Sequence, residues 1–265
     1  MLPVSVVIIA KDESTVIEQC ISKAKLITDD IVVVDNKSTD ATPQIAIKAG
    51  CRVYYSNWSN YGSNKNKGIG LAKYDWILSF DADEIPDIEL ILSLHDLALD
   101  DPAVVYDIKY QSYFGNKRIK HGRWGRDHHV RLFNRQLIRW SEPKVHEKLV
   151  LPKNIRIEKL QGYLHHYSVA DASECMTKAE NYARLSAENY FDSGKRSSFG
   201  SLYLSPLFAF IIDYIFFLGF LDGKEGLVIA KSIYKNKWLK YHHLAQMERD
   251  LLKKEFAEGA LVTHG

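Results

Sequence analysis

Three carboxylates that directly follow an apolar run are the clearest chemical feature of the sequence. They lie in the stretch Ser79-Phe80-Asp81-Ala82-Asp83-Glu84, and residues 76–80 have the pattern of a buried strand. Carboxylates one residue apart at the end of a strand can converge on a hard divalent cation such as Mg²⁺ or Mn²⁺, and such a cation bridges readily to a diphosphate. The stretch therefore predicts a metal site in which Asp83 is the expected ligand.

Two further polar stretches suit a nucleotide. Asp35 ends the apolar run 31–34 and is followed by a polar turn. This acid could bind a base or a ribose, or it could only organise the turn together with Asp40 and cap the next helix. Residues 60–68 contain several amides with Lys65 and Lys67 at the expected start of a helix. A helix start suits a diphosphate, although a solvated basic face has the same composition.

A region rich in arginine and histidine, 118–135, also contains Trp124 and Phe133. Single-stranded nucleic acid could bind such a mixture of cations and aromatic rings. The whole chain gives no general reason to expect a polyanionic partner, because 35 Lys+Arg balance 33 Asp+Glu. We therefore expect no nucleic acid. We favour Trp124 stacking on a sugar, while cations such as Arg131 meet an anionic acceptor or the donor diphosphate.

The elements that must position these residues alternate along the first hundred residues. Apolar runs typical of buried strands cover 4–10, 31–34, 52–56 and 76–80. Between the second and third runs, Thr42 can cap a helix that starts at Pro43 and ends before Gly50. This alternation indicates a mostly parallel sheet flanked by helices, in which ligands bind outside the carboxyl ends of the strands. The ends of the first, second and fourth runs, at 10–13, 35 and 81–84, all carry carboxylates.

The rest of the chain divides into an antiparallel part and a helical part. Residues 104–167 are strand-like, a helix is expected over 171–191, and a Gly- and Ser-containing break follows at 193–201. With 265 residues and 46% hydrophobic content, an α/β fold with one sizeable core is expected. We predict a catalytic domain over 1–168, with a nucleotide-binding half (1–100) and an acceptor half (101–168), and a C-terminal helical region over 169–265.

The C-terminal region contains a stretch of low charge that bears on membrane contact. Residues 202–221 form a 20-residue run, long enough to cross a bilayer, in which Asp213 is the only charged side chain. Five residues nevertheless make it a poor span: Tyr203, Pro206, Asp213, Tyr214 and Gly219. We expect it to lie in a membrane interface or to pack on the domain. Residues 231–243 place aromatic side chains on one helical face and lysines elsewhere, which suits an anionic leaflet; a core-facing aromatic stripe is the alternative.

Cysteine content and the N-terminus bear on the compartment. Three cysteines at unrelated spacings, without a CxxC pair, favour a reducing compartment and packing roles. The N-terminus lacks the basic start, long apolar stretch and cleavage site of a signal peptide. We expect a cytoplasmic protein in peripheral contact with the membrane.

Taken in order, these motifs resemble the family 2 glycosyltransferases of the GT-A fold, and more narrowly the bacterial glucosyltransferases that build the lipopolysaccharide inner core. The resemblance covers about residues 3–150 and rests on 6–13, 34–42, 62–68, 75–84 and Val145-His146-Glu147. It implies transfer of a hexose, glucose, from a UDP-sugar to a saccharide or lipid-linked acceptor of a cell-surface glycan. A divalent cation, Mg or Mn, and the cytoplasmic face of the bacterial inner membrane are implied as well.

The resemblance also implies roles for individual residues. Uracil, ribose and diphosphate of the donor would contact Ala10, Lys11, Glu13, Asp35, Lys65, Asp81 and Ala82. Arg131 lies in a segment that resembles the strand preceding the family's acidic position. There the family has an acidic pair, whereas this chain has His146-Glu147. His146 could complete the metal shell, contact phosphate, or only pair with a neighbouring surface charge.

Displacement of a nucleoside diphosphate from the C1 atom of a sugar needs two kinds of group. The leaving diphosphate needs positive charge, which a cation held by Asp83 and the ammonium group of Lys65 would supply. The acceptor hydroxyl needs a general base on the opposite face of the sugar, so that the reaction inverts the configuration. Glu147 is the first candidate, with Asp127 and Glu84 behind it.

Two other functions are compatible with these motifs. A non-catalytic nucleotide-binding membrane scaffold would keep the fold, but the acidic motif at 81–83 argues against a loss of turnover. A nucleotidyltransferase also uses paired carboxylates and a metal at the end of a parallel sheet. It would need a Gly-rich phosphate loop near the first strand, and the sequence has none there.

Overall fold

The computed structural model describes residues 1–57, 59–144 and 147–262, with side chains as far as Glu255. The chain forms two compact units. The first contains Met1–Lys120, Trp124–Pro143 and Glu147–Ser168, and the second contains the chain from Val169 on together with His121–Arg123 and Lys144. The sequence predicted a boundary between catalytic domain and helical region at residue 168.

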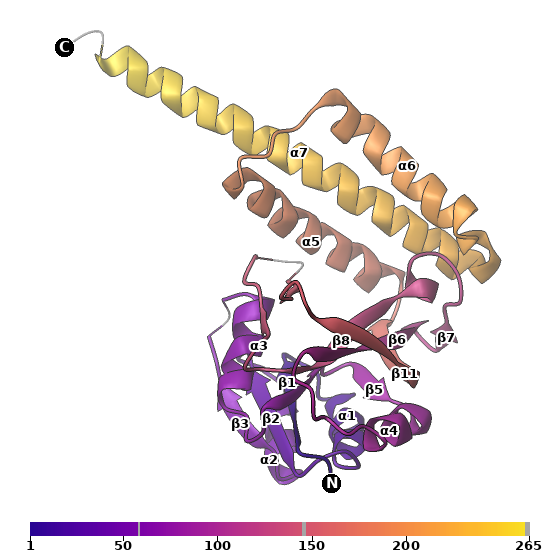
Figure 1. Ribbon diagram of the computed structural model, residues 1–265. Coiled ribbons are helices and arrows are strands. Elements are labelled where there is room, and N and C mark those ends of the chain that lie inside the picture. The colour runs from indigo at the N-terminus through magenta and orange to yellow at the C-terminus, as the bar shows by residue number, and fades with distance from the viewer. Residues whose placement is uncertain (58, 145–146, 263–265) are drawn as a thin grey trace. The chain divides into compact units, whose positions relative to one another are not determined.

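A parallel sheet forms the first half of the first unit (Figure 1). Its strands, in the order β3-β2-β1-β4, are β1 (Val4–Ala10), β2 (Asp30–Asp35), β3 (Arg52–Tyr55) and β4 (Trp76–Asp81). Its helices are α1 (Ile17–Ala24), α2 (Thr42–Lys48) and α3 (Tyr61–Gly70). The run of Val and Ile in β1 is buried along its whole length, as expected for a central strand covered on both faces. The predicted strands are confirmed to within one residue at each end.

An antiparallel half extends the same sheet. β8 (His128–Asn134) pairs with β4, and β6 (Val104–Phe114), β11 (Arg156–Val169) and β5 (Glu84–Pro86) follow in that order, with β7 (Lys117–Arg118) paired to β6. This confirms the antiparallel extension expected over 104–167. Helix α4 (Ile88–His95) is capped by Asp87, whose side chain accepts a hydrogen bond from the Leu90 amide. A separate hairpin consists of β9 (Arg139–Trp140) and β10 (Leu149–Val150), and Glu147 lies on the segment between them.

The start of α2 differs from the sequence prediction. Thr42 is not the capping residue: it is the first residue of the helix, and Ala41 occupies the cap position without a capping side chain. The hydroxyl of Thr42 instead donates to Asp40 and accepts from the Glu13 amide. Because its hydroxyl makes these two hydrogen bonds, Thr42 connects the loop after β1 with the loop after β2 and does not cap the helix.

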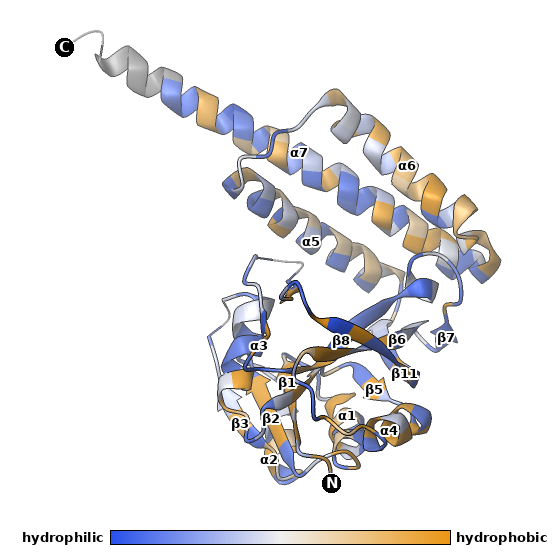
Figure 2. Ribbon diagram, in the orientation of Figure 1, coloured by the Kyte–Doolittle hydropathy of each residue, from blue (hydrophilic) through white to orange (hydrophobic). Residues whose placement is uncertain are grey.

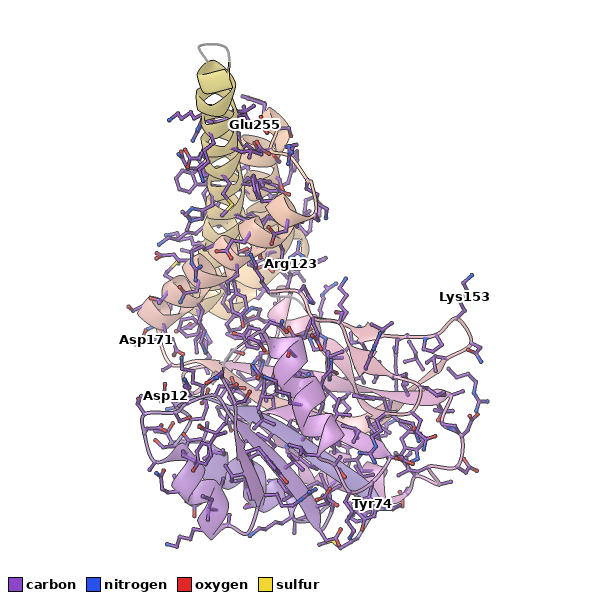
Figure 3. All side chains as sticks on the ribbon, turned by 90° about the vertical axis from the view of Figure 1, so that its left-hand side faces the viewer. Asp12, Tyr74, Arg123, Lys153, Asp171 and Glu255 are labelled. Atoms are coloured by element: carbon purple, nitrogen blue, oxygen red, sulfur yellow. The ribbon has the colours of Figure 1, made fainter. Side chains whose placement is uncertain are left out.

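The second unit is helical. It contains α5 (Ala172–Asp192), α6 (Ser205–Ile211) between two π turns, η2 (Gly200–Leu204) and η3 (Ile212–Phe216), the 3₁₀ turn η4 (Gly219–Asp222) and α7 (Gly223–Val262). The prediction of α5 is confirmed, and Asp171, labelled in Figure 3, caps it by accepting from the Glu174 amide. Helix α7 is far longer than the predicted 231–243. Gly226 lies within α7, where a Cβ would lie 1.9 Å from the Gly219 carbonyl oxygen, so the glycine allows the close approach of the η4 turn.

No single helix in the described part of the chain is long and apolar enough to cross a membrane. One bent pair, Gly200–Phe216 with Gly219–Glu255, meets the length and composition criteria together, with an angle of 69° between its parts.

Candidate active site

The carboxyl ends of three parallel strands bring the predicted nucleotide-binding residues together. Ala10 at the end of β1 pairs in register with Asp35 at the end of β2, and Ile9 pairs with Asp81 at the end of β4. Asp12, just beyond β1, and Tyr74, just before β4, lie at opposite ends of these strands (Figure 3). Parallel strands therefore gather at one edge the acids that the sequence places far apart.

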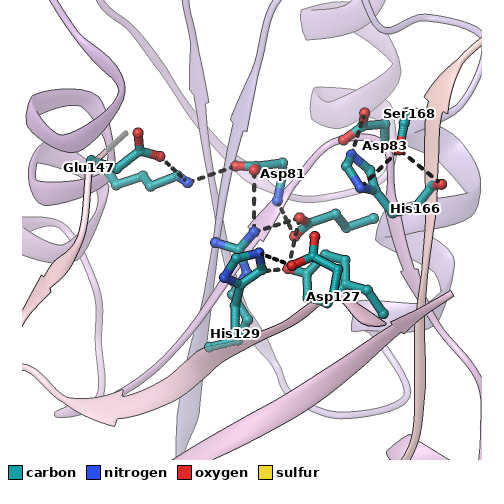
Figure 4. A network of polar contacts seen from close by, with 11 residues as sticks. Asp81, Asp83, Asp127, His129, Glu147, His166 and Ser168 are labelled. Atoms are coloured by element: carbon teal, nitrogen blue, oxygen red, sulfur yellow. Dashed lines mark hydrogen bonds and ion pairs between the residues drawn. The ribbon is translucent and has the colours of Figure 1, made fainter. Parts of the chain in front are cut away.

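Asp81 lies between two cations at this edge. One of its carboxylate oxygens is 3.1 Å from the Lys65 ammonium and the other is 3.4 Å from the Arg131 guanidinium. Burial alone would raise the pKa of Asp81, but Lys65 and Arg131 outweigh it and lower the pKa to about 2. Asp81 is therefore a carboxylate at any physiological pH. Figure 4 shows it between Glu147 on one side and Asp127 with His129 on the other.

A buried group lies behind Asp81 and holds it in place. The guanidinium of Arg131 is 2.5 Å from Glu84, whose carboxylate also accepts from the Tyr110 hydroxyl at 2.8 Å and from the Asp81 amide at 3.0 Å. Burial raises the pKa of Glu84 despite the attraction of Arg131. Glu84 is enclosed, so this candidate base has no route to an acceptor hydroxyl.

The burial of Arg131 also corrects its predicted role. We expected an acceptor contact, but the guanidinium is committed to Glu84, Asp81 and the Tyr110 hydroxyl and is almost completely buried. The residues of β8 from Arg131 to Asn134 are all buried, so both faces of the strand are covered there. Arg131 is therefore placed to hold the carboxylates of Asp81 and Glu84, and not to contact a saccharide.

Lys65 joins Asp81 to Glu147. Its ammonium group is 2.9 Å from one oxygen of Glu147 and lies over the Trp140 ring at 4.6 Å. The other oxygen of Glu147 forms no hydrogen bond to any residue in the described part of the chain. Lys65 is in the second turn of α3, beyond the capping residue Asn60, so the predicted diphosphate site at the helix start is not where this lysine points.

The glycines of α3 have packing reasons that the sequence analysis did not recognise. A Cβ at Gly62 would lie 1.9 Å from the Ser141 carbonyl oxygen and 3.3 Å from the Glu147 Cβ. A Cβ at Gly68 would lie 2.4 Å from a methyl group of Val7. The glycines thus let α3 approach both the central strand and the segment that carries Glu147.

Asp83 is paired with a histidine that the sequence analysis missed. The His166 ring nitrogen Nε2 is 3.3 Å from a carboxylate oxygen of Asp83, and Nδ1 is 3.0 Å from the Ser168 hydroxyl (Figure 4). Asp83 and its neighbours outweigh burial and raise the pKa of His166 to about 9. In metal sites the second nitrogen of a ligating imidazole is usually held by a hydrogen bond, as Ser168 holds it here. The ring would have to lose its proton to bind a cation beside Asp83.

A divalent cation fits this pair, with further ligands from outside the protein. Among the described residues, no three His, Cys, Asp or Glu side chains gather closely enough to hold a metal ion by themselves. Asp83 and His166 would therefore supply part of a shell that a diphosphate completes. His146, the other predicted ligand, lies outside the described residues.

The alternation of β11 could have revealed His166. Leu160, Gly162, Leu164, His166 and Ser168 share the inward face of this strand, and the pairing of His166 with Glu84 sets the register. An imidazole at an inward position of a strand needs a polar partner. Residues 104–167 were expected to be strand-like, but without an assignment of which side chains of each strand face inward.

Asp127 and Trp124 lie in the segment just before β8. Asp127 is 3.0 Å from the His129 ring and remains partly exposed. Burial acts to raise the pKa of Asp127, but the hydrogen bond and charge of His129 lower it overall, with smaller contributions from His166 and Arg131. Trp124 begins a short 3₁₀ turn and is half-buried.

The loops after β1 and β2 form the remaining part of the edge. The Ala10 carbonyl accepts from the Asn36 amide at 2.9 Å, and Lys11 is exposed. Asp35 is buried; one of its oxygens accepts from the Ser38 amide at 3.2 Å, and the other has no hydrogen-bond partner in the described structure. A buried carboxylate oxygen without a donor is costly, so this atom is suited to a donor from a ligand.

The chain is similar in sequence to several known proteins. An uncharacterized glycosyltransferase of Rickettsia prowazekii is 28% identical over 86% of this chain and 82% of its own length. The lipopolysaccharide core biosynthesis glycosyltransferase LpsC of Rhizobium meliloti is 28% identical over 86% of this chain and 89% of its own. A solved structure of glucosyl-3-phosphoglycerate synthase from Mycobacterium tuberculosis is 25% identical, with a TM-score of 0.35 over 43% of this chain and 44% of that one.

The family assignment rests on a match that spans more than half of the chain. The model of the family described as "Glycosyl transferase family 2" matches residues 5–158. The matched range contains the parallel sheet, the Asp81 and Asp83 pair, Lys65 and Glu147. The fold, the edge with its acids and this match together show that the chain is a glycosyltransferase that belongs to glycosyl transferase family 2.

Proposed function

We propose that this glycosyltransferase moves a hexose, glucose, from a UDP-sugar to a saccharide or lipid-linked acceptor of a bacterial cell-surface glycan, with inversion at the C1 atom. The observation that carries the proposal is the arrangement around Asp81. Lys65 and Glu147 lie on one side of Asp81. Asp83 follows Asp81 by two residues in the chain and contacts His166. These groups meet the two needs of the reaction, charge for the leaving diphosphate and a base for the acceptor.

The donor nucleotide would lie along the edge formed by the ends of β1 and β2. The N3–H group of uracil is a donor that suits the unpartnered oxygen of Asp35. The exposed Lys11 and the loop residue Glu13 lie next to this edge in the chain. Ala10 offers a small side chain there, and Ala82 is similarly small between Asp81 and Asp83, so the backbone can approach the ribose and the diphosphate.

A cation, Mg²⁺ or Mn²⁺, would be held by Asp83 and His166 and would neutralise the charge that develops on the leaving diphosphate. Ser168 orients the imidazole, so that Nε2 faces Asp83. Arg131 and Glu84 fix Asp81 from behind. Lys65 contributes a second positive charge at Asp81, on the side toward Glu147.

Glu147 is the proposed general base. One of its oxygens is held by Lys65, and the second, which accepts no hydrogen bond from the described residues, would accept the proton of an acceptor hydroxyl. A base on the face opposite the leaving group gives a single displacement and therefore inversion. Asp127 is the second candidate, but its lowered pKa makes it the weaker proton acceptor.

The acceptor and the location are proposed from sequence similarity and composition. The relative from Rhizobium meliloti is named for lipopolysaccharide core biosynthesis, which supports an acceptor of the lipopolysaccharide core or a lipid-linked saccharide. Such acceptors are membrane lipids, so we propose peripheral attachment at the cytoplasmic face of the inner membrane. Trp124 would stack on the acceptor sugar.

A panel of nucleotide sugars tests this function. The protein is incubated with UDP-glucose, other UDP-sugars or GDP-sugars, in Mg²⁺, Mn²⁺ or EDTA. The acceptor is a core saccharide isolated from lipopolysaccharide. We expect release of UDP from a UDP-hexose, dependent on the cation, and a product of inverted configuration. Release from GDP-sugars alone, or a product of retained configuration, would overturn the proposal. Binding of UDP without any turnover would indicate the scaffold, and turnover of nucleoside triphosphates the nucleotidyltransferase.

A further inference from the structure

The second unit carries an exposed apolar surface on the segment Gly200–Leu221. Its large side chains, at helical spacing on one face, are Leu204, Leu207, Phe208 and Ile215, continued by Phe216 and Leu221, and all six are exposed. Figure 2 shows the segment around α6 as largely hydrophobic, in contrast to much of α7. Single exposed apolar residues are ordinary, but a contiguous set of this size marks an interaction surface.

The only charge of residues 202–221 does not interrupt this surface. Asp213 is buried, and one of its carboxylate oxygens accepts from the Arg123 amide at 2.7 Å. A Cβ at Gly122 would lie 3.2 Å from both of its oxygens, so the backbone at 122–123 covers the carboxylate. The acid that made the segment a poor membrane span in the sequence is therefore turned away from the exposed face.

A cluster of lysines adjoins one end of the same segment. The Lys237 ammonium group is 3.5 Å from the hydroxyl of Ser205, the first residue of α6. Lys240 is nine-tenths buried, with its ammonium over the rings of Tyr190 at 4.3 Å and Tyr241 at 4.5 Å. Lys195 lies over the same Tyr190 ring at 4.2 Å. Within the part of the chain that the structure describes, none of the three lysines forms an ion pair with a carboxylate.

This cluster is electrostatically incomplete. Burial, together with the charges of Lys240 and Arg123, lowers the pKa of Lys237. Burial would raise the pKa of Tyr190, but the ammonium groups of Lys240, Lys195 and Lys237 outweigh it and lower the pKa. Like charges brought together repel one another, and cation–π contacts offset only part of this repulsion. An anion between the lysines would remove it.

We propose that Lys195, Lys237 and Lys240, with the Ser205 hydroxyl, bind the phosphate of an anionic lipid headgroup while the apolar surface of Gly200–Leu221 rests in the bilayer interface. Charge and position select this occupant, because a phosphate beside an acyl chain matches a basic cluster beside an apolar helix face. A second copy of the chain would bring a second set of unpaired lysines to the same place. A free phosphate would leave the apolar surface uncovered.

This inference names the groups that make the membrane contact of the proposed function. It rests on the proposed function only for which membrane is bound, the cytoplasmic face of the inner membrane. Co-sedimentation with vesicles of phosphatidylcholine, with and without phosphatidylglycerol, tests it without any sugar transfer. We expect binding that requires phosphatidylglycerol. Binding of UDP is measured in parallel, so that loss of nucleotide binding, a failure of the proposed function, is distinguished from loss of vesicle binding.

Two charge variants separate a headgroup site from general attraction. The double variant Lys237→Gln, Lys240→Gln is expected to weaken binding to phosphatidylglycerol vesicles ~30-fold, since a lysine near an anionic surface contributes about a factor of 5. The matched control, Lys231→Gln with Lys253→Gln, removes the same charge from exposed positions of α7 and should weaken binding less than ~5-fold. Equal losses in the two variants would overturn the headgroup site.

A third variant tests the apolar surface. Phe208→Ser with Phe216→Ser should abolish vesicle binding, whereas Ile47→Ser with Leu92→Ser, at exposed positions of the first unit, should leave it unchanged. A concentration-dependent dimer that disappears in the phenylalanine variant, without vesicle binding by the unaltered protein, would assign the surface to a second copy. Binding of inorganic phosphate to the lysine cluster without any vesicle binding would likewise overturn the lipid as occupant.

Discussion

The Lys65 ammonium group lies 2.9 Å from an oxygen of Glu147, although the two residues are 82 positions apart in the sequence. The same ammonium is 3.1 Å from Asp81. The contact connects the parallel half of the sheet, through α3, with the segment between β9 and β10. It gives Glu147 a fixed orientation in which one oxygen is held and the other is available for an acceptor.

The role of Glu147 as a base predicts the effect of removing its charge. Glu147→Gln should lower turnover by roughly two orders of magnitude or more and leave UDP-sugar affinity unchanged, because the amide oxygen still accepts from Lys65. Glu142→Gln, at an exposed acid near by in the chain, is the control and should keep normal turnover. If Asp127→Asn lost turnover and Glu147→Gln kept it, the base would be Asp127.

The close approach of Gly62 to the segment that carries Glu147 predicts a positional effect. Gly62→Ala places a methyl group 1.9 Å from the Ser141 carbonyl oxygen, so this segment must shift. We expect turnover to fall ~100-fold, since a displacement of about 1 Å at a reacting group has that effect. Gly70→Ala, which meets no atom within 4 Å, should leave turnover unchanged. Steady-state kinetics of the two variants at saturating donor decide the question, and similar values would refute the positional role.

The unpartnered oxygen of Asp35 predicts a defect in donor affinity. Asp35→Ala removes a charged acceptor for the base, which contributes about 1.5–3 kcal/mol, or roughly 10- to 150-fold in affinity. Turnover at saturating donor should change little, because this contact is made equally in the ground state and the transition state. Calorimetric titration with UDP gives the affinity. A large fall in turnover at unchanged affinity would speak against a nucleotide contact.

The loop after β2 predicts a dependence of stability on pH. Burial acts to raise the pKa of Asp40, but hydrogen bonds from Thr42 and the Ser14 amide lower it well below its usual range. A depressed pKa in the folded state stabilises the protein above the unfolded pKa of about 4, and this contribution is lost as the pH falls below it. Asp40→Asn should therefore be most destabilising near neutral pH.

Chemical denaturation of the wild type and Asp40→Asn between pH 7 and pH 3 measures this contribution. The difference in the free energy of unfolding should shrink toward the acid end. Asp100→Asn, an acid-to-amide change at an exposed loop position, is the matched control. A difference that stays constant or grows on acidification would contradict the assigned hydrogen bonds.

The strand ends could be predicted from the sequence because local patterns determine them. The apolar runs of β1, β2 and β4 end where acids begin, and parallel strands bring such ends together. The contacts of Lys65 could not be predicted, because they depend on how closely α3 approaches the sheet. Gly62 and Gly68 set that approach through tertiary packing, whereas the amides and lysines of the same stretch suggested a phosphate site.

Arg131 was expected to contact the acceptor and His166 was not predicted as a site residue, and both differences have the same physical reason. Both residues lie on strands of the antiparallel half, where the face of each side chain depends on register. β8 has an irregular register against β6 between Tyr106 and Asp107, so the buried position of Arg131 is not evident from simple alternation. His166 is placed beside Asp83 only by the pairing of β11 with β5.

The most direct test of the account is the release of UDP from UDP-glucose, with acceptor, in Mn²⁺ or in EDTA, by the wild type and two carboxylate variants. Asp83→Asn removes the proposed metal ligand, and Asp29→Asn removes an exposed carboxylate at the opposite end of the sheet. We predict release that requires the cation, persists in Asp29→Asn and falls below detection in Asp83→Asn, with the same unfolding midpoint for both variants. Undiminished release by Asp83→Asn, or release by the wild type that is indifferent to EDTA, would contradict the account.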